Sequence, residues 1–132
     1  MYPEVLDTYR KVNEQFFGNP SSLHRLGNEA DALLQQSRKQ IAQLLGAQPD
    51  EIFFTSGGTE SDNWAIKGTA MEKFAAGKHM IASSVEHPAV SKSLEQLEKL
   101  GFEITYLPVD ADGIVSVEEL GKAIRKDTIL VS

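Results

Sequence analysis

Apolar residues recur at helical spacing along the stretch that follows residue 25. They are Leu26, Ala30, Leu33, Leu34, Ile41, Leu44 and Leu45. A spacing of three to four residues predicts one long amphipathic helix, interrupted only by the polar Ser37 on the same stripe. Gly46 follows the last of these residues and suits the cap at the end of such a helix.

The rest of the chain alternates between strand-like and helix-like patterns. Short runs of β-branched and aromatic residues predict buried strands at 51–55, 79–83, 102–109 and 128–132. Helices are predicted to run from about Gly58 to Gly77, from Pro88 to Gly101, and onward from a capping box at 116–119. The residues expected on their buried faces are Trp64, Ile66, Ala70, Met71 and Phe74 in the first, Val90, Leu94 and Leu97 in the second, and Leu120 and Ile124 in the third.

Strands that alternate with helices, and that are too apolar to face water, predict an α/β fold. We expect a three-layer sandwich in which helices cover both faces of a mostly parallel sheet. A length of 132 residues without repeats or linkers predicts one domain, with 1–27 as an N-terminal segment carrying a Gly-Asn-Pro-Ser-Ser loop and 28–132 as the α/β core. Because residues 129–132 stop inside an expected central strand, we expect the chain to be a fragment.

The run TSGGTE at 55–60, called the Gly-Gly turn below, joins a predicted strand to the first turn of a predicted helix. Free backbone N–H groups and the positive end of the helix dipole favour an anion there, and Gly58 lets it approach the backbone while the Thr59 hydroxyl adds a donor. The alternative is an ordinary turn in which Thr59 only caps the helix. The turn is therefore a candidate phosphate-binding site.

His87 is a second candidate, because it follows the 79–83 strand and precedes a helix that opens at Pro88. Ligands of open α/β sheets bind outside the carboxyl ends of the strands, so His87 and Thr59 could face one pocket. The alternative is a surface or capping histidine. His24 and His79 have no spacing that would form a metal site with it, so no metal is expected, and His79 is interpreted as a strand-edge residue.

Composition excludes several classes of protein. A net charge of −6 without a basic patch argues against nucleic-acid binding. With no cysteine in the chain, there is neither a disulfide framework nor a thiol nucleophile in these residues. No window reaches the ~20 apolar residues of a membrane span, and no basic leader precedes an apolar run, so we expect a soluble cytoplasmic protein.

Four segments stand out when they are read together: FGNPSSLHRLG at 17–27, EIFFTSGGTESDNWAIKG at 51–68, SSVEHPAV at 83–90 and LPVDADGIVSVEEL at 107–120. In order and spacing they resemble the cysteine desulfurases of the NifS/IscS type, relatives of the class V aminotransferases among the fold-type I pyridoxal-phosphate enzymes. The resemblance implies that Gly58 and Thr59 hold the phosphate of pyridoxal 5'-phosphate. It also implies that His87 stacks on the pyridine ring and assists proton transfer, as a histidine can near neutral pH.

The resemblance further implies a homodimeric parent enzyme that moves sulfur from L-cysteine to an enzyme cysteine, releases L-alanine, and passes the persulfide sulfur to an acceptor protein for Fe–S cluster or thio-cofactor biosynthesis. The Schiff-base lysine, the acidic partner of the pyridine nitrogen and that cysteine would lie beyond Ser132. Lys67 is predicted about two turns past Thr59, roughly 12 Å along the helix, too far to replace the lysine.

We therefore expect the chain alone to be inactive and to bind the cofactor weakly at best. Three alternatives remain at this point, one of which is a soluble α/β domain in which Thr59 only caps a helix. A selenocysteine lyase or another class V relative would share these segments, and a non-catalytic anion-binding α/β domain would explain the Gly-Gly turn without catalysis.

Overall fold

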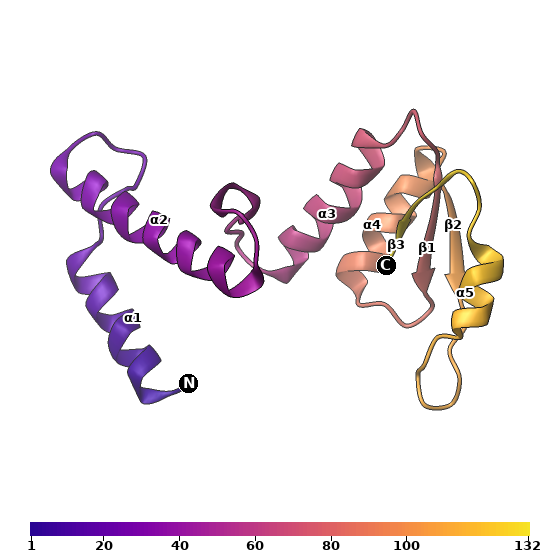
Figure 1. Ribbon diagram of the computed structural model, residues 1–132, viewed down its shortest axis with the longest axis horizontal. Helices are drawn as coiled ribbons and strands as arrows, with labels where there is room; N and C mark the ends of the chain where they lie inside the picture. The colour runs from indigo at the N-terminus through magenta and orange to yellow at the C-terminus, as the bar shows by residue number, and fades with distance from the viewer. The chain divides into compact units, whose positions relative to one another are not determined.

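A computed structural model describes residues 1–132 and divides them into two compact units, residues 1–54 and residues 55–132. The first unit contains α1 (Pro3–Gln15), α2 (Arg25–Leu45) and the short 3-10 helix η1 (Pro49–Glu51) (Figure 1). The second unit contains α3 (Gly58–Glu72), β1 (His79–Ser83), α4 (Pro88–Lys99), β2 (Glu103–Leu107), α5 (Val117–Ala123) and β3 (Thr128–Val131).

Helix α2 forms where the apolar periodicity predicts it, and its ends have clear local causes. At the start, the His24 side chain accepts a hydrogen bond from the Gly27 N–H. At the end, Gly46 adopts the left-handed conformation with φ 67°, which confirms the predicted cap. Gly27 is buried where the preceding loop passes over the start of α2. A Cβ there would lie 2.2 Å from the Ser22 carbonyl oxygen, so this close approach requires a glycine.

The strand predicted at 51–55 is wrong. Only η1 forms there, and Phe53 and Phe54 are 67% and 46% exposed. The Arg38 side chain donates to the Ile52 carbonyl and lies 4.9 Å from the centre of the Phe54 ring, so α2 holds this segment in place of a sheet. An apolar run becomes a strand only where a neighbouring strand pairs with its backbone groups, and no such strand is present.

The sheet of the second unit therefore has three strands rather than the four predicted, in the order β2-β1-β3, and both pairings are parallel. His79 of β1 pairs in register with Glu103 of β2 and with Thr128 of β3. Side chains alternate along β1, so Met80 and Ala82 enter one core. That core is completed by Ile66, Ala70, Val90, Leu94, Leu97 and Phe102.

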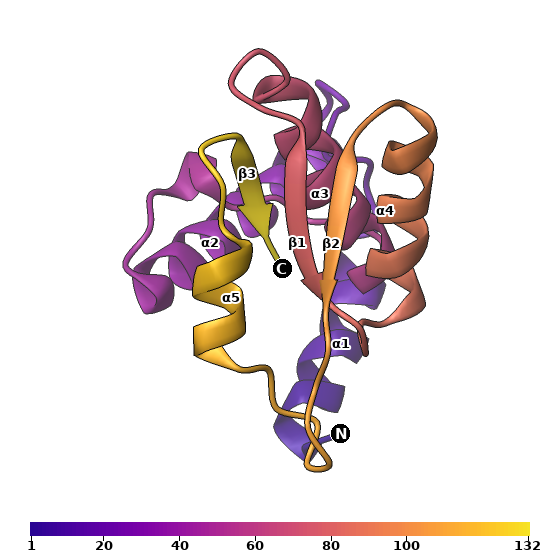
Figure 2. The same cartoon turned by 90° about the vertical axis from the view of Figure 1, so that its right-hand side faces the viewer.

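Helices lie on both faces of this sheet, as predicted. Figure 1 and Figure 2 together show α3 and α4 on one side of the three strands and α5 on the other, which gives the three layers of an α/β sandwich. Helix α4 confirms its predicted buried face of Val90, Leu94 and Leu97.

The other two helices are only partly as predicted. In α3 only Ile66 and Ala70 are buried. Trp64 and Met71, together with Phe74 just past the end of the helix, are about half exposed, so that part of the prediction is wrong. This helix also ends at Glu72, before Gly77. In the short α5, Leu120 is partly buried, but Ile124 lies just past the helix and is exposed, which contradicts its predicted inward position.

Candidate functional site

The two candidate site segments lie at the same end of the second unit. Helices α3 and α4 pack side by side (Figure 1). A short loop connects the end of α3 to β1, and another connects the end of α4 to β2. Both helices therefore begin at the end of the sheet where β1 and β2 finish. Gly58 is the first residue of α3, and His87 is the N-cap of α4. Thr59 and His87 therefore lie at the starts of two helices that cover one face of the sheet.

The Gly-Gly turn has a backbone shape that requires glycine. Gly57, the N-cap of α3, has φ 159° and ψ 179°, a combination that side chains with a Cβ rarely adopt. The Thr55 hydroxyl lies 2.7 Å from the Ser61 hydroxyl, and both hydroxyls donate to the Gly57 carbonyl at 3.2 and 3.3 Å. Side chains on either side of the glycine thus fix the direction in which α3 begins.

Glu60 makes the shortest hydrogen bond in this turn. One oxygen of its carboxylate accepts from the Ser56 N–H at 2.6 Å and from the Ser56 hydroxyl at 2.8 Å. These two bonds stabilise the charged form and hold the pKa of Glu60 below its ordinary value. Sequence spacing does not single out Glu60, although an acidic residue in the first turn of a helix is a recognised N-terminal signal.

The first turn of α3 leaves backbone donors unpaired. The N–H groups of Gly58, Thr59 and Glu60 precede the first intrahelical bond and have no other partner, since the first bond of the helix runs from the Ser61 N–H to the Gly57 carbonyl. The Thr59 hydroxyl also makes no hydrogen bond, and the residue is exposed. Space beside Gly57 and Gly58 is open, since an added Cβ would meet no atom within 4 Å. This donor set fits a phosphoryl group, although no cationic side chain lies in the turn.

His87 has a defined ring orientation. Its Nδ1 accepts from the Ala89 N–H at 3.1 Å, and Pro88 occupies the first helical position of α4. The structure thus contains the capping role that was the alternative for this residue. With Nδ1 accepting, the proton of the neutral ring resides on Nε2, which makes no hydrogen bond and is the atom free to meet a ligand.

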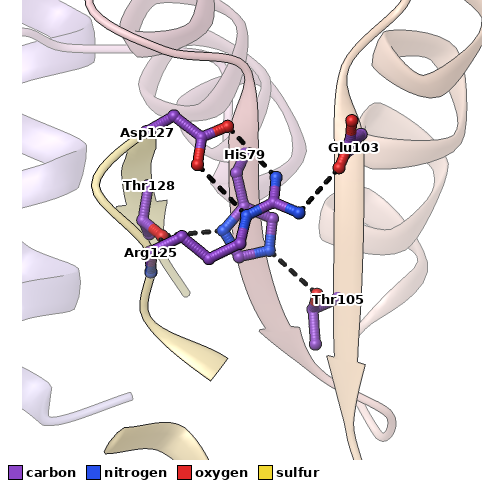
Figure 3. Close-up of polar contacts among 6 residues, drawn as sticks. All are labelled: His79, Glu103, Thr105, Arg125, Asp127 and Thr128. Atoms are coloured by element: carbon purple, nitrogen blue, oxygen red, sulfur yellow. Dashed lines mark hydrogen bonds and ion pairs between the residues drawn. The ribbon is translucent and has the colours of Figure 1, made fainter. Parts of the chain in front are cut away.

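A polar cluster at the opposite end of the sheet was missed by the sequence analysis (Figure 3). His79 is 1% exposed in the central strand, which contradicts its interpretation as a strand-edge residue. Its Nδ1 lies 2.7 Å from the Thr128 hydroxyl and its Nε2 lies 2.8 Å from the Thr105 hydroxyl. Burial is the main reason that the pKa of His79 lies below its ordinary value, and the nearby Arg125 lowers it further.

Arg125 covers this cluster with ion pairs. Its guanidinium reaches a Glu103 oxygen at 2.7 Å and Asp127 oxygens at 3.1 Å (Figure 3). The cluster joins the starts of β1, β2 and β3 by side-chain bonds. It lies away from the Gly-Gly turn, so its contribution is to the sheet rather than to the candidate site.

Other features of the chain do not compete with the Gly-Gly turn. A cavity of about 530 Å³ between α1 and α2 is lined mainly by apolar side chains such as Val12, Phe16 and Leu33. No group of three or more His, Cys, Asp or Glu side chains is arranged to hold a metal ion. None of the helices has the length and apolar character that crossing a membrane requires.

Comparison with known proteins gives close relatives over the whole chain. A NifS/IcsS protein homolog of Lactobacillus delbrueckii subsp. bulgaricus is 58% identical over 132 residues, which are 100% of this chain and 34% of that protein. Proteins named cysteine desulfurase IscS, from Dictyoglomus turgidum and Methanosarcina thermophila, are 54% and 52% identical over 98% of this chain and cover 33% and 32% of their own lengths. The chain thus spans about a third of the length of the curated relatives it matches.

Solved structures agree with these relatives. A NifS-like protein superimposes with a TM-score of 0.91 at 38% identity, over 99% of this chain and 36% of that one. A structure of SspA in complex with cysteine gives a TM-score of 0.87 at 39% identity, over 99% of this chain and 38% of that one. The aminotransferase class-V family model matches residues 1–132. The chain therefore belongs to the aminotransferase class-V family, as the resemblance of its motifs implied.

Proposed function

We propose that this chain is the N-terminal part of a cysteine desulfurase and that its Gly-Gly turn holds the phosphate of pyridoxal 5'-phosphate. The observation that carries the proposal is the set of unpaired N–H groups at Gly58, Thr59 and Glu60 beside open space. Relatives named cysteine desulfurase that are more than half identical to this chain support the choice of enzyme. A phosphoryl group would satisfy donors that otherwise face water.

The Gly-Gly turn would bind the phosphate through positioned donors and partial charge, without a formal positive charge. The amides of Gly58 and Thr59 and the Thr59 hydroxyl donate to phosphate oxygens, and the positive end of the α3 dipole adds to the attraction. No lysine or arginine in the turn contributes, so we expect this chain to hold phosphate weakly, with a dissociation constant on the order of 1 mM. In a full-length protein, residues from elsewhere would supply the remaining affinity.

His87 would lie against the pyridine ring and present its Nε2–H group to the substrate. Its Nδ1 bond to the Ala89 N–H fixes the plane of the imidazole, so the ring face stays available for stacking. Nε2 carries the ring proton and is left to donate a hydrogen bond to the substrate. The bound cofactor would supply an electron sink for the substrate amino acid, which the side chains of the protein lack.

The proposed parent takes L-cysteine as substrate and transfers its sulfur to an enzyme cysteine and then to an acceptor protein. No cysteine occurs in these 132 residues, so the chain by itself is expected to release no alanine from L-cysteine. A homodimeric, cytoplasmic parent belongs to the same proposal. The Schiff-base lysine and the persulfide-forming cysteine would come from the part of a full-length protein that this chain does not contain.

The proposal is tested by ligand-induced stabilisation of the chain. Inorganic phosphate and pyridoxal 5'-phosphate at 10 times their dissociation constants should each raise the unfolding free energy by about 1.4 kcal/mol, whereas pyridoxal without phosphate should not. Thr59→Val removes the hydroxyl while keeping the shape, and should weaken both ligands. Thr69→Val makes the same change further along α3 and should not. Stabilisation by pyridoxal alone, or equal behaviour of the two variants, would contradict the assignment.

A further inference from the structure

The Ser56–Glu60 contact ties the loop to the first turn of α3, as the Thr55–Ser61 hydroxyl contact also does, but it is the contact that holds the residue directly before the N-cap. The same Glu60 oxygen accepts from both the N–H and the hydroxyl of Ser56. The common arrangement at a helix start has the acidic side chain bonded to the N-cap N–H. Here the N-cap is Gly57, and the bond reaches one residue further back.

The contact removes Ser56 from the set of donors that an external anion could use. Both donors of this residue already point at a carboxylate, while the N–H groups of Gly58, Thr59 and Glu60 remain unpaired. A phosphoryl group would therefore meet the first turn of α3 and not the loop before it. The direction of those amides depends on how the loop enters the helix.

The loop has little else to hold it. Ser56, Gly57 and Gly58 are exposed, and an added Cβ at either glycine would contact nothing within 4 Å. No packed side chain therefore fixes the backbone of the Gly-Gly turn. The hydroxyl contacts of Thr55 and Ser61 converge on the Gly57 carbonyl, and only Glu60 secures the residue before it.

We propose that Glu60 is a positioning residue for phosphate binding: by holding Ser56, its carboxylate fixes the Gly-Gly turn so that the first amides of α3 converge on one anion. The inference rests on the proposed function, because it concerns the same turn. Glu60 itself does not touch the ligand through its side chain. A carboxylate beside a phosphate is repulsive, so the contribution of Glu60 lies in the shape of the turn rather than in its charge.

Two substitutions separate shape from charge. Both Glu60→Gln and Glu60→Ala remove the negative charge, but only glutamine retains a side-chain oxygen that can accept from Ser56. Titration with inorganic phosphate should therefore give a dissociation constant about fivefold higher for Glu60→Ala than for Glu60→Gln, the effect of about one lost hydrogen bond. Glu72→Gln, at the far end of the same helix, is the control for removing a charge and should bind phosphate as the unchanged chain does.

A second measurement requires no ligand. The chemical shift of the Ser56 amide proton should follow the protonation of Glu60 as pH falls through the acidic range, and should not titrate in Glu60→Gln. Equal phosphate affinity of Glu60→Ala and Glu60→Gln, or a Ser56 amide that ignores pH in the unchanged chain, overturns the inference. If the unchanged chain binds neither phosphate nor pyridoxal 5'-phosphate, the proposed function fails, while the Ser56 titration still decides whether Glu60 holds the turn.

Discussion

Lowering the pH should reduce the unfolding free energy of the second unit, because His79 is buried in it. This side chain is 1% exposed, and its ring nitrogens lie within hydrogen-bond distance of the Thr105 and Thr128 hydroxyls. The Arg125 N–H donates to the Thr128 hydroxyl, which leaves the hydroxyl proton of Thr128 for His79 Nδ1 and favours a neutral ring protonated on Nε2. Charging the ring would place a cation in the sheet beside Arg125, so its pKa is lowered from the ordinary value.

The size of the effect follows from proton linkage. An unfolded histidine titrates near pH 6.5, and the folded one titrates lower, so between these two values the unfolded chain binds the additional proton. Stability due to His79 is therefore complete above about pH 6.5 and is lost as the pH falls toward the folded pKa. The loss cannot exceed about 1.4 kcal/mol per pH unit, which limits it to about 1.4 kcal/mol between pH 6.5 and 5.5.

Urea unfolding followed by tryptophan fluorescence measures this directly, because Trp64 is the single tryptophan and lies in the second unit. The control is His79→Gln, which keeps an amide able to form hydrogen bonds but cannot titrate. His24 and His87 are present in both proteins, so their effects cancel in the difference. The reasoning is refuted if both proteins lose equal stability between pH 7.5 and 5.5, or if the unchanged chain gains stability as the pH falls.

Four further substitutions test the second unit, each by urea unfolding. Gly77→Ala should destabilise it by 3 kcal/mol or more, on the order of a severe core overpacking, because the new Cβ would lie 2.1 Å from the Asp127 carbonyl oxygen. Gly68→Ala, inside α3 with no atom within 4 Å, should instead stabilise by about 0.5–1 kcal/mol, and an equal loss in both would contradict the steric reading. Leu94→Ala should cost about 2–5 kcal/mol because Leu94 is fully buried in the core, and a cost under 1 kcal/mol would disprove its central place. Ser116→Ala should cost about 1 kcal/mol by removing the cap of α5, measurable also as lost helical circular dichroism, and no change would exclude that cap.

The sequence predicts best those elements whose cause is local. Helices α2 and α4 combine clean apolar spacing with a stop signal, and β1 to β3 are short apolar runs bounded by turns. The run at 51–55 has the same local pattern as these strands, yet pairing depends on a neighbour that no local pattern reveals. Helix α3 begins where the sequence predicts but ends before Gly77, and the uneven spacing of its apolar residues does not distinguish Ile66 from the exposed Trp64.

The candidate site divides in the same way. A glycine pair before a helix is a local signal, and it correctly located Gly58 and Thr59 at the start of α3. The bond from Glu60 to Ser56 depends on the unusual backbone at Gly57, which sequence spacing does not specify. The cluster at His79 could not be predicted either, because Thr105 and Thr128 meet it only once the register of the strands is known.

Parallel pairing around β1 also sets an order for folding. The contact of His79 with Thr105 closes a span of 26 residues, whereas its contact with Thr128 closes one of 49. Closing the longer span costs about 0.6 kcal/mol more in chain entropy, so β1, α4 and β2 should assemble before β3 arrives. Until then one edge of β1 is bare and can recruit a strand from another molecule. Refolding yield should therefore fall as protein concentration rises, because intermolecular pairing with β1 remains possible until β3 has paired with it.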